Sequence, residues 1–177
     1  EEEVVEKFPL SEQQQRAIGE IEQQFEGKNV VLLHGVTGSG KTRVFIELIQ
    51  KIIDRGEQVL YLLPEIALTT QIVQRLQRIF GDQIVVYHSR VSNNDRVEMW
   101  QEVAAGKPIV LAARSGIFLP FQNLKFIVVD EEHDPSYKQS DPNPRYQGRD
   151  TAIYLATLHG AKVLLGTATP SLESYQN

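Results

Sequence analysis

Residues 35–42 limit the possible folds of this chain more than any other segment. They read Gly-Val-Thr-Gly-Ser-Gly-Lys-Thr and match the phosphate-binding pattern Gly-x4-Gly-Lys-[Ser/Thr]. A β-branched run at residues 30–33 precedes them, and residues 43–54 space their apolar side chains as an amphipathic helix does. A strand, a glycine-rich turn and a helix start in this order predict that backbone N–H groups and the positive end of a helix dipole point at one phosphate.

The residue types in this segment fit a nucleotide triphosphate. Glycine permits the backbone to approach an anion closely. Lys41 is expected to reach the β- and γ-phosphate oxygens, and the Thr42 hydroxyl is expected to be a Mg²⁺ ligand. The alternative is a glycine-rich turn that binds no ligand, and the flanking strand and helix argue against it. The residues predicted to bind the phosphates are Gly35, Thr37, Gly38, Ser39, Gly40, Lys41 and Thr42.

Composition excludes few classes of function. The 177 residues are enough for one domain with a sizeable core, and the chain has no cysteine, which suits a cytoplasmic protein. No apolar run approaches the ~20 residues needed to cross a bilayer. The net charge is −5, and four glutamates among the first six residues account for most of it. We expect residues 1–9 to be a tail or linker, residues 10–177 to be the folded lobe, and the chain to be a fragment of a longer protein.

Strand-like and helix-like segments alternate along the chain, which predicts an α/β fold with a mostly parallel sheet and helices on both faces. Trp100 is expected to pack in the core, because it falls at helical spacing with Val97 and Val103. Strands are predicted at residues 30–33, 58–63, 83–88, 109–113, 126–129 and 162–165. Ser11 is predicted to cap a helix that runs to about residue 25. Further helices are predicted at residues 43–54, 66–80, 95–105 and 148–159, with a helical turn at 170–175.

A second candidate motif follows the apolar run at residues 125–129, which leads into Asp-Glu-Glu-His-Asp. A carboxylate at the end of a buried strand is the Walker B arrangement, so Asp130 is expected to hold Mg²⁺. Glu131 is placed to accept a proton from the water that attacks the γ-phosphate. His133 is expected to report the nucleotide state to the next motif. A loop turn or a helix cap is the alternative for an isolated Asp-Glu pair.

Several strings now resemble a known family. Asp-Glu-Glu-His at residues 130–133 resembles motif II of superfamily 2 helicases, and Gly-Thr-Ala-Thr-Pro-Ser at 166–171 resembles their motif III. Residues 64–69, 114–121 and 130–139 are more specific and resemble the primosomal replication-restart helicases. The resemblance runs from residue 10 to residue 175 and implies the first of two RecA-like motor lobes.

This resemblance implies roles for further residues. Gln14 would read the adenine edge, and Thr167 and Thr169 would couple the nucleotide state to DNA. The composition of residues 136–149 fits DNA independently, since Tyr and Arg stack on bases while Lys and Arg neutralise phosphates. A Pro-rich surface loop is the other interpretation of that stretch. The residues implied to contact DNA are Thr69, Arg114, Tyr137, Lys138, Arg145 and Tyr146.

The resemblance further implies an ATP-dependent 3′-to-5′ DNA helicase that acts in replication restart and primosome assembly. Its cofactors would be ATP and Mg²⁺, and its partners would be single-stranded and forked DNA and replication-restart proteins, with no membrane. The arginine finger, the second lobe and a zinc module would lie outside these residues, so the lobe alone is expected to be nearly inactive.

Three alternative functions stay open at this point. These alternatives are another superfamily 2 DNA translocase, a P-loop metabolite kinase, and a nucleotide-binding module without motor activity. The Asp-Glu-Glu-His and Thr-Ala-Thr strings have no explanation in the kinase interpretation.

Overall fold

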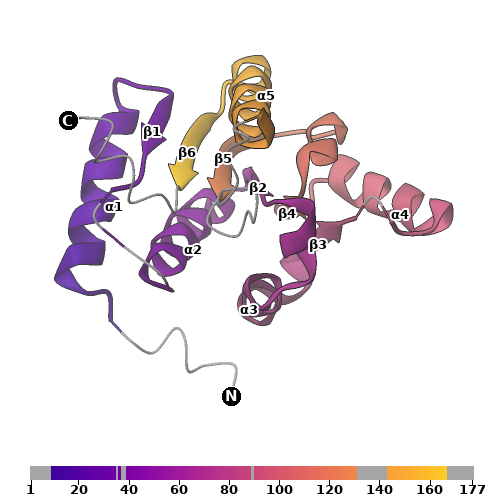
Figure 1. Ribbon diagram of the computed structural model, residues 1–177, viewed down its shortest axis with the longest axis horizontal. Helices are drawn as coiled ribbons and strands as arrows, with labels where there is room; N and C mark the ends of the chain where they lie inside the picture. Colours follow the sequence, from indigo (N-terminus) through magenta and orange to yellow (C-terminus); the bar gives the residue numbers. More distant parts are fainter. Residues whose placement is uncertain (1–8, 35, 37–38, 89, 131–142, 167–177) are drawn as a thin grey trace.

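A computed structural model describes residues 9–34, 36, 39–88, 90–130 and 143–166. Its centre is one six-stranded sheet in which every pairing is parallel, so the predicted α/β class is confirmed (Figure 1). The strands, in their order across the sheet, are β1 (Val30–Leu32), β6 (Lys162–Gly166), β5 (Leu124–Asp130), β2 (Gln58–Leu62), β4 (Ile109–Ala112) and β3 (Ile84–Tyr87).

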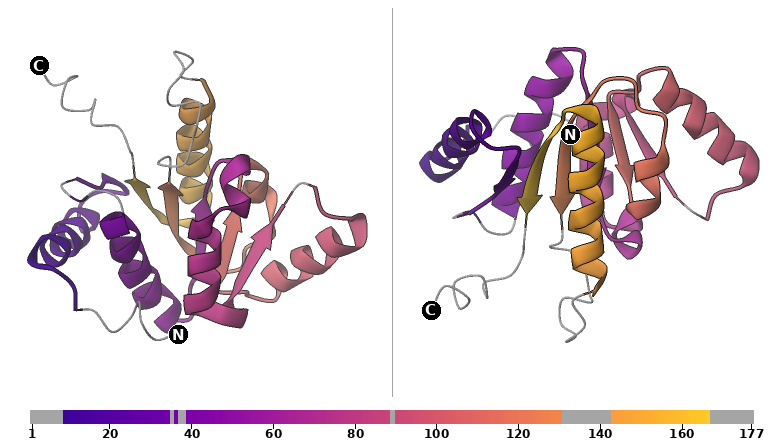
Figure 2. Two further views of the ribbon diagram at one scale, coloured as in Figure 1. Left: turned by 60° about the horizontal axis from the view of Figure 1, so that its bottom comes forward. Right: turned by 90° about the horizontal axis from the view of Figure 1, so that it is seen from above.

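Helices cover both faces of the sheet, as Figure 2 shows. One hydrophobic cluster joins α1 (Glu12–Phe25), α2 (Ser39–Asp54) and α3 (Gln71–Phe80) to one face. A second cluster joins α4 (Asn93–Ala104) and α5 (Asn143–His159) to the other. Because both faces are covered, the strands are continuous apolar runs with no alternation of polar residues.

The segment predicted as one helix over residues 66–80 is two elements, and that prediction was wrong. A 3₁₀ helix, η1 (Glu65–Thr69), precedes α3, and Thr70 between them is extended with φ −93° and ψ 179°. The Thr70 hydroxyl donates to the Ala67 carbonyl at 2.6 Å, so a side chain ends the first helical segment locally. Two further 3₁₀ helices, η2 (Gly81–Gln83) and η3 (Arg114–Phe118), were not predicted from the sequence.

Trp100 corrects a second expectation, because its side chain is 45% exposed rather than part of the core. Only Val103 of that predicted set is fully buried. The helix α4 lies at the β3 end of the sheet, where little of the sheet remains for a helix to cover (Figure 1). Helical spacing therefore identified the helix correctly but assigned too wide a buried face to it. Within the described residues, no helix has the length and apolar character needed to cross a membrane.

Candidate functional site

The first turn of α2 carries the two side chains that the sequence assigns to the phosphates and the metal. Lys41 and Thr42 are both buried, at the end of the helix that follows the carboxyl end of β1. Free backbone N–H groups and the positive end of the helix dipole lie at this end of a helix. A buried lysine at such a position is suited to an anion of high charge density, such as a phosphate.

Gln14 connects α1 to this turn. Its Nε2 donates to the Gly40 carbonyl at 3.3 Å, and its Oε1 accepts from the Ser11 N–H at 2.9 Å as half of a capping box. The predicted adenine reader therefore lies beside the start of α2, with both ends of its amide bonded within the chain. Gly40 itself leaves room for Val36, since a Cβ there would lie 2.8 Å from the Val36 side chain.

Asp130 ends β5 and is only 2% exposed. The Tyr61 hydroxyl, from the buried strand β2, donates to its Oδ2 at 2.7 Å. This bond orients the carboxylate. Sequence analysis missed Tyr61, although a tyrosine within an apolar strand gives a signal, because a buried phenol needs a hydrogen-bond partner.

Aromatic contacts connect Asp130 to α2. Phe45 follows Lys41 by one turn of α2, and its ring meets the Tyr61 ring edge-to-face at 5.8 Å. The same ring lies against Gly166 at the end of β6, where an added Cβ would be 2.5 Å from it. Lys41 and Asp130 therefore belong to one packed region at the carboxyl edge of the sheet. In the sheet, β6 lies between β1 and β5, so the strand that ends in Asp130 is two positions away from β1.

The residues at this edge fit a magnesium ion by their donor chemistry. Mg²⁺ takes oxygen ligands and is held through one or two carboxylates together with substrate phosphates. Thr42 offers a hydroxyl and Asp130 offers a buried carboxylate.

The Arg75 guanidinium on α3 lies near Arg43 and Tyr61. Burial, and then the charge of Arg43, lower the pKa of the Arg75 guanidinium, while Tyr61 acts in the opposite direction. Arg43 is itself paired with Glu47 at 2.6 Å.

Two of the predicted DNA contacts lie on neighbouring turns of the same edge. Thr69 is in η1, which follows β2, and Arg114 opens η3, which follows the adjacent strand β4. Both side chains are exposed. The same turns expose Ile66 by 62% and Phe118 by 75%, two apolar side chains that sequence analysis did not single out.

The remaining predicted site residues are not placed in this way. Arg145 and Tyr146 fall in the first turns of α5, and Ser39 falls in the first turn of α2, but only their backbone is described. Outside the described residues are Gly35, Thr37, Gly38, Glu131, His133, Tyr137, Lys138, Thr167 and Thr169, and the helical turn predicted at 170–175.

Comparison with known proteins identifies the family. The model of the DEAD/DEAH box helicase family matches residues 11–177. The chain belongs to this family. Replication restart protein PriA of Bacillus subtilis is 43% identical over 173 residues, which are 96% of this chain and 21% of the PriA chain. PriA of Haemophilus influenzae is 49% identical over 152 residues, 85% of this chain and 21% of its own. The resemblance to replication-restart helicases is therefore confirmed, and the chain spans about a fifth of these relatives.

Solved helicases confirm the RecA-like fold. The DUF1998 helicase MrfA superposes with a TM-score of 0.67 at 22% identity, covering 99% of this chain and 30% of MrfA. Mycobacterium smegmatis helicase Lhr, solved with single-stranded DNA and AMP-PNP, superposes with a TM-score of 0.60 at 20% identity, covering 93% of this chain and 26% of Lhr. At this level of identity the likeness concerns the fold alone.

Proposed function

We propose that this chain is the ATP-binding lobe of an ATP-dependent DNA helicase that acts in replication restart. One observation carries the proposal: Lys41 and Thr42 at the start of α2 are joined to Asp130 at the end of β5 through Phe45 and Tyr61. A lysine, a hydroxyl and a carboxylate at one sheet edge are the parts that phosphoryl transfer from a nucleotide needs.

In this mechanism the phosphate loop holds the triphosphate and Lys41 neutralises charge on its β- and γ-oxygens. Thr42 and Asp130 would hold Mg²⁺, which would supply positive charge to stabilise the negative charge that develops on the phosphate oxygens. Glu131 accepts a proton from the attacking water, whose oxygen bonds to the γ-phosphorus as the bond to the bridging β–γ oxygen breaks. The products are ADP and inorganic phosphate.

DNA would run along the turns at the carboxyl edge. Thr69 and the Arg114 guanidinium are exposed there, and Arg114 would contact the phosphate backbone. Tyr137, Lys138, Arg145 and Tyr146 would follow a single strand by stacking and charge, and His133, Thr167 and Thr169 would couple it to the nucleotide. The two PriA relatives are replication restart proteins, which favours a role in replication restart for this chain. In this proposal the whole protein moves 3′ to 5′ on forked DNA in the cytoplasm, meets other restart proteins and holds any zinc outside this segment.

The full-length protein with Glu131→Gln tests this function. A motor loses unwinding and ATP turnover in this variant but keeps ATP binding, because only the proton acceptor changes. A module that acts only by binding nucleotide keeps its function in the variant, and this result would reject the motor. Transfer of phosphate to a small metabolite in an acceptor screen would instead identify a kinase.

The isolated chain offers a second test. An arginine finger typically contributes 10³–10⁵ to the rate of phosphoryl transfer, and we place it outside this lobe. The chain alone should therefore bind ATP weakly with Mg²⁺ and hydrolyse it at a small fraction of the full-length rate. DNA-stimulated turnover by the chain alone, at the rate of the full-length protein, would contradict this division of the site.

A further inference from the structure

The turn η3 exposes an aromatic ring at the carboxyl edge of the sheet. Phe118 is 75% exposed, more than any other large apolar side chain that the structure describes. The other exposed aromatic members of this group, Trp100 and Tyr154, lie on the helices α4 and α5. Among these three rings, only that of Phe118 lies where a parallel sheet binds its ligands.

Close packing holds η3 in one position on the sheet. Gly116 lies against the end of β4, since an added Cβ would be 2.3 Å from the Ala112 side chain. The Leu119 N–H donates to the Gly116 carbonyl at 3.2 Å, and the Leu119 side chain is buried. Ile117 packs against the same core cluster as Leu119. Phe118 therefore projects from a turn that both of its neighbours anchor.

The period of a 3₁₀ helix decides which side chains this turn exposes. With three residues per turn, side chains three positions apart lie in one row. Gly116 faces the sheet, whereas Ser115 and Phe118 share another row and are both exposed. Arg114 is exposed in the remaining row. The turn thus presents a guanidinium, a hydroxyl and an aromatic ring to solvent.

These three groups suit the parts of a nucleotide in a single strand. Arginine and serine side chains bind phosphate oxygens, which position the strand. An aromatic ring stacks on a base, and it accepts any sequence because every base has a π-face. One turn therefore offers contacts to the backbone and to a base together.

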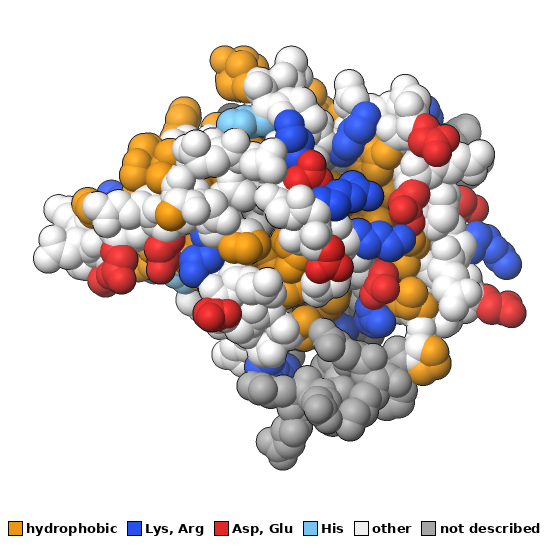
Figure 3. All heavy atoms as spheres, turned by 180° about the vertical axis from the view of Figure 1, so that it is seen from behind, with side chains coloured by type: hydrophobic (Ala, Val, Ile, Leu, Met, Phe, Trp, Pro, Cys, Tyr) orange, Lys and Arg blue, Asp and Glu red, His pale blue; other side chains and the backbone are white. Residues whose placement is uncertain are grey.

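Charge alone gives this chain little attraction for DNA. Its net charge is −5, and Figure 3 shows basic and acidic side chains interspersed on the rear face. Affinity from phosphate contacts grows with the number of phosphates that lysine and arginine neutralise. Stacking adds affinity by a different interaction, so an exposed ring at the DNA edge compensates for a low positive charge.

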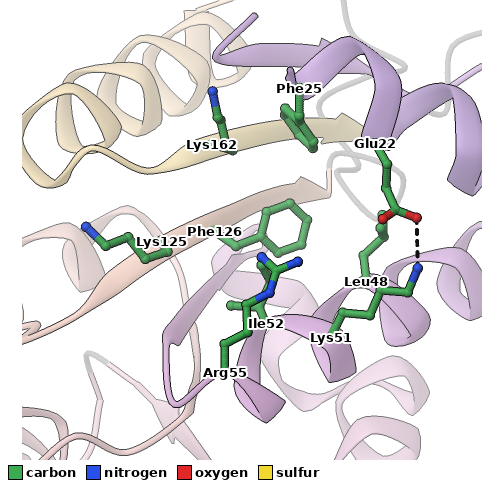
Figure 4. A pocket seen from close by; sticks show the side chains of 9 residues that line it. All are labelled: Glu22, Phe25, Leu48, Lys51, Ile52, Arg55, Lys125, Phe126 and Lys162. Carbon is green, nitrogen blue, oxygen red and sulfur yellow. Dashed lines mark hydrogen bonds and ion pairs between the residues drawn. The ribbon is translucent and has the colours of Figure 1, made fainter. Parts of the chain in front are cut away.

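The opposite, amino edge of the sheet has aromatic rings but no open aromatic face. A cavity of about 210 Å³ lies there, between the last turns of α1 and α2 and the first residues of β5 and β6 (Figure 4). The Phe25 and Phe126 rings in it meet edge-to-face at 6.2 Å, and Phe126 is buried. Lys51 at its rim is paired with Glu22 at 2.8 Å. The carboxyl edge is therefore the better place for a base.

We propose that Phe118 stacks on a base of single-stranded DNA while Arg114 and Ser115 contact the adjoining phosphate backbone. This inference rests on the proposed helicase function and adds a base contact to the backbone contact assigned to Arg114. A protein surface is the other kind of partner that covers an exposed ring. Contact with protein would not depend on whether the DNA strand carries bases, and this difference provides the test.

The test uses the full-length protein and two labelled strands in fluorescence anisotropy. One strand is oligothymidylate, and the other has the same length but carries abasic sites in place of the thymines. Phe118→Leu keeps an apolar side chain without the ring, so it should weaken oligothymidylate binding about tenfold and leave abasic binding unchanged. Phe118→Tyr keeps the ring and should bind both strands like the wild type.

Two further variants separate stacking from charge and from surface position. Arg114→Gln should weaken binding of both strands equally and reduce the slope of log affinity against log salt by about 0.7. Tyr154→Leu is the matched control, because it also removes an exposed ring but lies on α5. It should leave the binding of both strands unchanged.

The proposal is overturned if Phe118→Leu weakens both strands equally, which would indicate a structural role or a contact with protein. It is also overturned if the variant weakens neither strand, or if the wild type binds both strands with the same affinity. The helicase function survives each of these results as long as DNA stimulates ATP turnover by the wild type. A wild type that binds neither strand and shows no such stimulation would reject the helicase function as well.

Discussion

The two edges of the sheet bury polar side chains in opposite ways. At the amino edge, Gln58 is 2% exposed and is neutral. Its Nε2 donates to the carbonyls of Val103 and Lys107, at 3.1 and 3.0 Å, and its Oε1 accepts from the N–H groups of Gln122 and Asn123, at 2.7 and 2.9 Å. These four bonds satisfy the whole amide.

At the carboxyl edge the buried polar side chains include charged ones, Lys41 and Asp130, together with the Thr42 hydroxyl. A buried charge costs far more free energy than a satisfied amide does, unless a partner of opposite charge compensates it. The amino edge thus uses buried polarity to hold loops to the sheet. The carboxyl edge instead buries charged side chains of the kinds that bind phosphate and metal ions.

Gln58→Leu should have the largest effect on stability. It leaves the N–H groups of Gln122 and Asn123 and two carbonyls without their side-chain partner, so we expect a loss of about 3 kcal/mol in the free energy of unfolding. Urea denaturation measures the change. Gln101→Leu, at an exposed site of α4, is the control and should change stability by less than about 0.5 kcal/mol. A near-neutral Gln58→Leu would remove the contrast between the edges.

The variants Lys41→Ala and Lys51→Ala compare nucleotide binding at the two ends of α2. Lys41→Ala should have the larger effect. Loss of the charged bond to phosphate should weaken nucleotide binding about a hundredfold, as measured by titration with a fluorescent ADP analogue. Lys51 lies at the other end of α2 in an exposed pair with Glu22, so its variant should bind nucleotide normally. Equal losses in both variants would mean that the carboxyl edge does not hold the phosphates.

Gly166→Ala tests how closely α2 packs on β6. The added methyl group would lie 2.5 Å from the Phe45 ring and should cost about 2 kcal/mol of stability by overpacking. Gly148→Ala in α5 is the matched substitution, because no other group lies within 4 Å of the added carbon. That control should be neutral or more stable by thermal denaturation, and a neutral Gly166→Ala would show that Phe45 moves freely.

Tyr61→Phe removes only the hydroxyl that donates to Asp130. The carboxylate should then be less well oriented, so the Mg²⁺ concentration that half-saturates the enhancement of nucleotide binding should rise about tenfold. Nucleotide binding in EDTA should stay unchanged, which separates this effect from a general loss of structure. Tyr87→Phe in β3 is the control. An unchanged magnesium dependence would assign Tyr61 to packing alone.

His159 should give the smallest effect, at the amino edge. Burial, and then Lys125, lower its pKa below the ordinary value of 6.5, so the folded state favours the neutral imidazole. The unfolded chain binds the proton more readily, and stability should fall by a few tenths of a kcal/mol as the pH drops below 6.5. His159→Leu should reduce this loss in urea denaturation at pH 7.5 and 5.5. An identical pH dependence in both proteins would contradict the assignment.

The sequence was sufficient to predict the sheet and most helices, because a sheet that is covered on both faces has a simple residue pattern. Strands buried on two faces read as apolar runs, and Ser11 marks a helix start with its hydroxyl. Residue pattern also singled out Lys41, Thr42 and Asp130, whose roles stay predictions. It missed the break at Thr70 because a local side-chain bond competes with helical periodicity, and it missed Tyr61 because that residue acts through a contact 69 positions away.

The position of β6 between β1 and β5 has a geometric consequence. Adjacent strands lie about 4.8 Å apart, so the strand leading to the phosphate loop and the strand ending in Asp130 are separated by roughly 10 Å. Whatever bridges that gap must pass over the tip of β6. That tip is Gly166, so the residue that a bridging triphosphate would cross carries no side chain.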